Sequence, residues 1–165
     1  IDAVIEKIHA PEIAQQLLQQ YISLWHDEGV GKTPWLQEVI SKLIVVAEDG
    51  SPAILAEVYR LLGEDEKAEK FFRLDIANNG ESLQTTIGLA DCQRDATSMR
   101  HAIHGIEPNR ENHYWFWLAN ARLVHWFCED GGDKMKARAK VNRLSRLDSN
   151  LGGEQFATLF RAAVE

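Results

Sequence analysis

The chain contains little cysteine, with Cys92 and Cys128 as its two thiols in 165 residues. Two thiols cannot form the disulfide framework of small secreted domains, and they do not stand in a CxxC spacing. The sequence also lacks a run of the roughly 18 apolar residues that a membrane-spanning helix needs, and no signal peptide opens it. These absences favour a reduced, cytoplasmic setting and no membrane association.

Positive charge is also scarce. The 18 Lys and Arg residues against 25 Asp and Glu residues give a formal net charge of −7. This balance argues against binding to nucleic acid, because a phosphate backbone usually requires a basic face that displaces counterions. One basic run nevertheless allows two interpretations, a solvated helix face or a site for an acidic partner. It comprises Lys134, Lys136, Arg138, Lys140, Arg143 and Arg146.

The chain has four prolines and no convincing run of alternating apolar and polar residues, which argues against a β-sheet. Apolar residues instead recur at helical spacing, so the fold class is all-α. A first long helix is predicted from Pro11 to just before Gly29. A second is predicted to have Thr33 as its N-cap and Pro34 in its first turn, and to stop at Gly50.

The segment HDEGVGKTPW, residues 26–35, ends like a phosphate-binding loop. That motif requires a glycine five residues before the Gly-Lys pair and a strand before the loop. Here His26 occupies the glycine position, a predicted helix precedes the loop, and Pro34 removes a backbone amide. We therefore interpret this segment as a helix stop, a turn and a helix start, without a nucleotide site.

Residues 51–79 predict two short helices separated near Gly63. Five positions in them resemble the tetratricopeptide repeat, a helix pair of about 34 residues. These positions are Leu55, Ala56, Tyr59, Ala68 and Phe72. One repeat length further on, four of the positions remain small or apolar, and Gln93 replaces the tyrosine. These four are Leu89, Ala90, Ala102 and Ile106.

A third, degenerate unit begins at His113. Trp115, Leu118 and Ala119 occupy the first-helix positions of the repeat, and Ala137 and Val141 occupy those of the second helix. The unit departs from the repeat in its longer helices and at Arg122, which replaces the tyrosine. Residues 151–165 predict a short capping helix, with Phe156, Leu159 and Phe160 on one face.

The resemblance implies an antiparallel helix-pair array, that is, a tetratricopeptide-like α-solenoid with a right-handed superhelix. On this interpretation residues 1–165 form a single helical-repeat domain. It comprises N-terminal helices in 1–48, three repeat-like units in 49–150, the second and third degenerate, and the capping helix. Small residues at the key positions would let neighbouring helices approach closely, because a lone helix pair cannot bury its apolar face.

The resemblance also implies a concave groove lined by the first helix of each unit, which binds an extended peptide or a helix. The groove-facing residues would be Glu57, Arg60, Gln84, Asp91, Arg94, His113, Phe116 and Asn120. This set lacks the Lys and Asn combination by which some family members hold a peptide's C-terminal carboxylate. The alternative for each residue is an ordinary solvated helix surface.

Candidates for other chemistry are weak. His101 and His104 share a helix face near His113, but no metal-ligand motif such as HExxH is present. Both cysteines fall in predicted helix interiors, and the paired carboxylates lie at helix ends, where they complement the helix dipole. The sequence therefore predicts no catalytic residue, no cofactor and no metal.

Six aromatic residues between Tyr114 and Phe127 would face nearly all sides of one helix, which predicts a helix buried by several neighbours. Core packing is the favoured interpretation, and the alternative is that Phe116 or Trp126 anchors a partner.

The predicted function is a non-catalytic protein-protein interaction module or scaffold that binds a protein or peptide. Because the chain begins at Ile1 rather than at methionine, a regulatory or substrate-recruiting domain excised from a larger multidomain enzyme is an alternative. A third hypothesis is a small-ligand or metal sensor that uses the aromatic helix with His101, His104 and His113.

Overall fold

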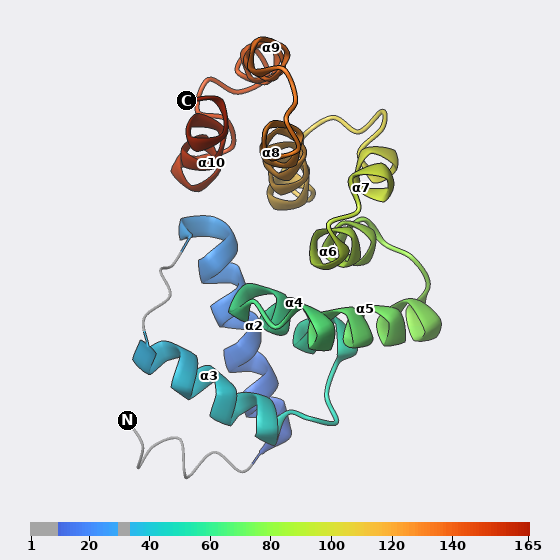
Figure 1. The fold of residues 1–165 in the computed structure, drawn as a ribbon. Helices are drawn as coiled ribbons and strands as arrows, with labels where there is room; N and C mark the ends of the chain where they lie inside the picture. The colour runs from blue at the N-terminus through green and yellow to red at the C-terminus, as the bar shows by residue number, and fades with distance from the viewer. Residues whose placement is uncertain (1–9, 30–33) are drawn as a thin grey trace. The chain divides into compact units, whose positions relative to one another are not determined.

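The computed structural model describes residues 10–29 and 34–165, and within these ranges the chain forms nine α-helices and no strand (Figure 1). The all-α prediction is confirmed. None of the described helices combines the length and apolar character needed to cross a bilayer. The helices are α2 (Pro11–Glu28), α3 (Pro34–Val46), α4 (Pro52–Leu62), α5 (Asp65–Asn79), α6 (Leu83–Gln93), α7 (Ala96–Ala102), α8 (His113–Glu129), α9 (Lys134–Leu144) and α10 (Glu154–Val164).

The helices begin and end where the sequence is locally punctuated. Helix α2 starts at Pro11, whose missing N–H is tolerated in a first turn, and it ends at Gly29, which adopts a left-handed φ of 62°. Gly63 ends α4 in the same way, with a φ of 78°. These predicted boundaries are confirmed, whereas the predicted N-cap Thr33 and the Gly31-Lys32 pair lie outside the described residues.

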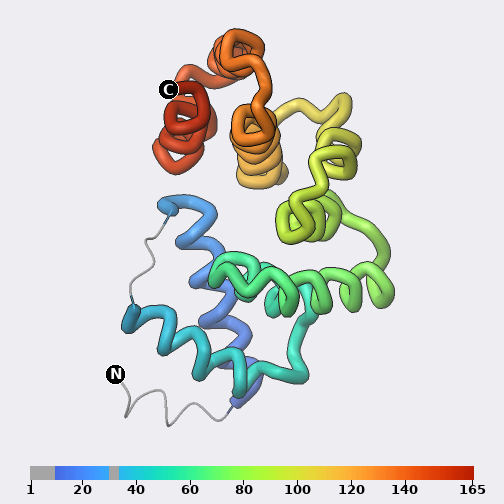
Figure 2. The backbone as a smooth tube through the Cα atoms, viewed as in Figure 1, coloured from blue at the N-terminus to red at the C-terminus, as the bar shows by residue number. Residues whose placement is uncertain are grey.

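The chain divides into two compact units, one up to Gln93 and one from Arg94 onward. The boundary falls between α6 and α7, the two helices of the predicted second repeat, and Figure 2 allows the backbone of each unit to be followed separately. The prediction of one continuous repeat domain over residues 1–165 stays a prediction.

The first unit has a core in which α2, α3 and α4 pack together through buried residues such as Leu18, Leu43 and Leu55. Helix α4 also packs against α5, and α5 against α6. Ala56 and Phe72 are fully buried together with Ala68. These are positions of the repeat pattern, so its small and aromatic residues do fill the interior of this unit.

Helix α8 is the centre of the second unit and contacts α7, α9 and α10 (Figure 1). Its buried aromatic residues interlock with α10: the ring of Trp117 meets that of Phe160 edge-on at a centroid distance of 6.4 Å. Gly152 comes so close to Trp117 that an added Cβ would stand 2.2 Å from the indole. The prediction of an aromatic helix buried by several neighbours is confirmed.

Candidate functional site

Three of the predicted groove residues form a buried ionic cluster in the first unit. Arg60 donates through Nε and Nη2 to the two carboxylate oxygens of Glu57, at 2.8 and 2.7 Å. Its Nη1 donates to Oδ2 of Asp91 at 2.7 Å, and His26 Nε2 lies 2.7 Å from Glu57 Oε1. The cluster joins α2, α4 and α6.

The carboxyl group of Glu57 is fully buried. Burial alone would raise its pKa, but the charge and hydrogen bonds of Arg60, together with the hydrogen bond of His26, hold that pKa below its ordinary value. These contacts between its members stabilise the packing of the first unit. The expected groove role of Glu57, Arg60 and Asp91 stays a prediction, and the enclosure of Glu57 and Arg60 does not favour it.

Among the other predicted groove residues, Gln84 belongs to the first unit, and Arg94 and His113 belong to the second. Gln84 is half-buried on α6, in the first unit. Arg94 is exposed in the second unit, where it pairs with Glu129 at 3.1 Å and with Asp130 at 2.9 Å. Nε2 of His113 lies 2.9 Å from the carbonyl oxygen of Gly152. Within the second unit, Arg94 and His113 therefore interact with different groups.

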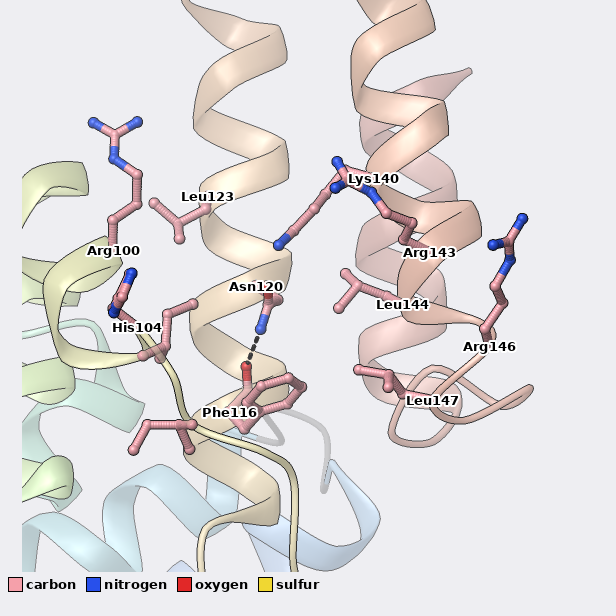
Figure 3. Close-up of a pocket in the computed structure, with 12 residues that line it drawn as sticks. Arg100, His104, Phe116, Asn120, Leu123, Lys140, Arg143, Leu144, Arg146 and Leu147 are labelled. Carbon is pink, nitrogen blue, oxygen red and sulfur yellow. Dashed lines mark hydrogen bonds between the residues drawn. The ribbon is translucent and has the colours of Figure 1, made fainter.

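Phe116 and Asn120, by contrast, lie together on α8 and line a groove of about 640 Å³ in the second unit. Figure 3 shows Arg100 and His104 on one side of α8, with Arg143, Arg146 and Leu147 on the other. The groove is formed by α7, α8 and α9 with the turns that follow α7 and α9. Its lining comprises Arg100, Ile103, His104, Ile106, Phe116, Asn120, Leu123, Lys140, Arg143, Leu144, Arg146 and Leu147.

The groove combines apolar walls with a concentration of positive charge. Four of its twelve lining residues are Lys or Arg, and no carboxylate occurs among the twelve. Lys140, Arg143 and Arg146 form no ion pair with a described carboxylate, whereas the hydrogen bonds from Ser98 and Thr97, and after them the charge of Arg100, lower the pKa of Asp95. Partial burial, and to a lesser degree the charge of Arg143, lower the pKa of Lys140. The groove is thus a positive surface on a chain that carries a net charge of −7.

Asn120 leaves a polar atom unsatisfied beside this groove. Its side chain is 1% exposed, and its Nδ2 donates to the carbonyl oxygen of Phe116 at 2.9 Å. Since a carbonyl oxygen only accepts, this bond fixes the orientation of the amide. Oδ1 of Asn120 is then the one buried side-chain polar atom of the described residues without a hydrogen-bond partner. Most buried polar atoms have a partner, so this acceptor requires an explanation.

The basic run identified in the sequence divides between two environments. Lys140, Arg143 and Arg146 line the groove, whereas Arg138 donates to the carbonyl oxygen of Val164 at 2.9 and 3.2 Å. The helical spacing of residues 140, 143, 144 and 147 was the available indication of a shared face. The residues from Arg100 to Ile106 carried no such indication, because their position beside α8 depends on tertiary packing.

The metal and nucleophile candidates of the sequence can be located among the described residues. Within them, no group of three His, Cys, Asp or Glu residues could hold a metal ion, and His104 lines the groove without such a group. Burial, the dominant influence, raises the pKa of the Cys92 thiol to about 12. That thiol is therefore neutral near pH 7 and is not activated as a nucleophile.

Comparison of the chain with protein-family models, curated protein sequences and solved structures gives no significant match. The tetratricopeptide resemblance consequently rests on the residues that carry it, such as Ala56, Ala68 and Phe72. Function has to be argued from the groove and its charges.

Proposed function

We propose that this chain is a non-catalytic protein-interaction module or scaffold, and that the groove of the second unit binds a segment of a protein. The observation that carries the proposal is the unsatisfied Asn120 acceptor beside exposed apolar residues. Ile106 is 36% exposed and Leu147 is 59% exposed, and both line the groove. Apolar side chains gathered in an exposed hollow with polar groups around them are typical of interaction sites.

A tetratricopeptide-like solenoid remains our proposal for the architecture. The burial of Ala56, Ala68 and Phe72 supports it, as does the succession of short helices. The proposed site differs from the one that the resemblance implies, because α7 and α9 are the second helices of their predicted units. Phe116 and Asn120 are the two predicted groove residues that the proposed site retains.

The second candidate is a regulatory or substrate-recruiting domain of a larger multidomain enzyme. The same groove would then hold a segment of its own protein, and the complete gene would show whether a catalytic domain is present. In both cases the chemistry of the groove is the same.

A selection of peptides tests the groove as a binding site. The full chain is used to select from a display library of random peptides about 16 residues long, a length sufficient for two or more helical turns or one strand. The enriched peptides are then measured against a variant with Ile106→Ser and Leu147→Ser. We expect binding to fall on the order of tenfold, because two apolar contacts are lost.

The matched control carries Val45→Ser and Leu74→Ser in the first unit. These side chains are 71% and 43% exposed, so the control removes similar apolar surface from residues that do not line the groove. Equal binding to the chain and to both variants would refute the groove as the site.

A further inference from the structure

We infer that the occupant of the groove is an acidic protein segment, in which Asp or Glu side chains flank large apolar residues, and that it donates a backbone N–H to Oδ1 of Asn120. This inference rests on the proposed function, because it names the partner chemistry of the same groove. It is carried by three features that one ligand must satisfy together: apolar walls, unpaired positive charge and a buried acceptor.

The charge of the groove is complementary to carboxylates. Arg100 and His104 stand on one side of α8, with Arg143 and Arg146 on the other (Figure 3). Lys140 extends from α9 toward Asn120 in the same view. Arg100, Lys140, Arg143 and Arg146 all line this one hollow, so their like charges repel one another when it holds water alone. An acidic occupant would remove that repulsion and add charge-assisted hydrogen bonds.

The Asn120 acceptor distinguishes a peptide from a simple anion. A carboxylate anion supplies acceptors for the groove cations but no donor for Asn120 Oδ1. A peptide backbone supplies a donor at every residue except proline. Free N–H groups are present both along an extended segment and in the first turn of a helix, where Asp and Glu are also favoured. One acidic segment can therefore satisfy the acceptor and the cations at once.

A protein segment fits the walls better than a nucleic acid does. The apolar lining is mostly aliphatic, including Ile103, Ile106 and Leu147, and its one aromatic ring, Phe116, is 5% exposed. Single-stranded nucleic acids are usually held by exposed aromatic rings on which their bases stack. The net charge of −7 also repels a polyphosphate backbone at long range. Aliphatic side chains of a peptide could pack against the aliphatic lining of the groove.

The test uses the same random-peptide selection on the full chain. We expect the enriched peptides to contain more Asp and Glu than the starting library, together with large apolar residues. Two of them are synthesised with a fluorescent label, and their affinity is measured by anisotropy at low and high NaCl. The affinity should fall as salt rises, because screening weakens the attraction between exposed charges.

Variants in α9 and in the turn that follows it test the charge. Replacing Arg143 and Arg146 with Gln should weaken the acidic peptides on the order of tenfold, as two charge pairs are lost. Lys134→Gln with Lys136→Gln is the matched control, because it removes the same charge from exposed positions of α9 outside the groove. The control should leave the affinity unchanged.

The Asn120→Leu variant tests the acceptor. Leucine has a similar shape but offers no acceptor, so the affinity should fall about tenfold, the loss expected for one good hydrogen bond. The melting temperature should not fall, because the substitution removes an unsatisfied buried atom. A lower affinity with an unchanged melting temperature would show a loss of recognition, whereas a variant that fails to fold would lose affinity and thermal stability together.

The outcomes separate this inference from the proposed function. Neutral or basic peptides that depend on Ile106 and Leu147 would overturn the acidic inference and leave the groove as an interaction site. A single-stranded oligonucleotide that binds more tightly than the selected peptides and depends on Arg143 and Arg146 would also overturn it. If no selected peptide depends on the groove, both proposals fail.

Discussion

Replacing Arg60 with methionine tests whether the buried ionic cluster serves folding rather than binding. The interactions of Arg60 include three hydrogen bonds of 2.7 to 2.8 Å, two to Glu57 and one to Asp91. Each bond to a charged group contributes about 1.5–3 kcal/mol, but the three share one guanidinium and do not add. Removing one member of a buried ion pair costs about 3–5 kcal/mol. We expect that loss in the free energy of unfolding of the first unit.

The pH dependence of the stability of Arg60→Met provides a second, independent test of the buried cluster. Burial is the largest single influence on the pKa of Glu57, so without Arg60 we expect that pKa to rise above its ordinary value. At low pH the buried Glu57 of the variant is protonated and neutral, which favours the folded state. This stabilisation is lost as the pH rises through the raised pKa. The stability deficit relative to the native chain should therefore be largest near pH 7 and shrink toward about pH 5.

Amide hydrogen exchange followed by mass spectrometry measures the protection of the helices in each unit separately. Protection should fall in α4 and α6 and stay unchanged in α8. The matched control is Arg73→Met, which removes an exposed pair with Glu69 and should cost less than about 1 kcal/mol. If Arg60→Met reduces protection of α4 no more than Arg73→Met does, the reasoning about buried charge is refuted.

Three further predictions concern the first unit. Ala56→Leu places a large side chain at a fully buried position and should destabilise the chain by about 1–3 kcal/mol in urea unfolding, so an unchanged midpoint would count against the repeat register. Gly88→Ala should also destabilise the chain by about 1–3 kcal/mol, because the added Cβ would stand 2.3 Å from the ring of the buried Phe72. Alanine favours helices more than glycine does, so a raised melting temperature would contradict this prediction. The lowered pKa of Glu57 implies that its ionised carboxylate contributes to folding stability above about pH 4.5 and that this contribution is lost in acid. The melting temperature of Glu57→Gln should therefore decrease less steeply below that pH than the melting temperature of the native chain.

The helices were predictable because their limits depend on local chemistry. Pro11 and Gly29 delimit α2, and Gly63 separates α4 from α5, through backbone preferences that act without tertiary contacts. The aromatic content of α8 likewise predicted a central helix, since no surface helix presents large apolar groups on all sides. The division between α6 and α7 was not predictable, because it depends on which helices pack against each other.

The polar residues show where sequence reasoning fails. Glu57 and Arg60 stand three residues apart on a helix face, a spacing that suits a pair but does not say whether the pair is exposed. Their burial depends on partners 31 residues away in each direction, His26 and Asp91. The sequence therefore identified these residues but assigned them to a surface. The basic run leaves two interpretations open, and packing places Lys140, Arg143 and Arg146 at the groove and Arg138 at the carbonyl oxygen of Val164.

The buried polar groups of the two units differ, and this contrast supports the groove as the proposed binding site. In the first unit the buried charges of Glu57 and Arg60 bind each other and also His26 and Asp91. In the second unit the buried Asn120 has an unpaired acceptor beside Lys140, Arg143 and Arg146, which form no ion pair with a described carboxylate. Such an arrangement reduces the stability of the isolated fold, because an unsatisfied buried acceptor costs about 1–3 kcal/mol. A partner that supplies the missing donor and negative charge would recover that energy on binding.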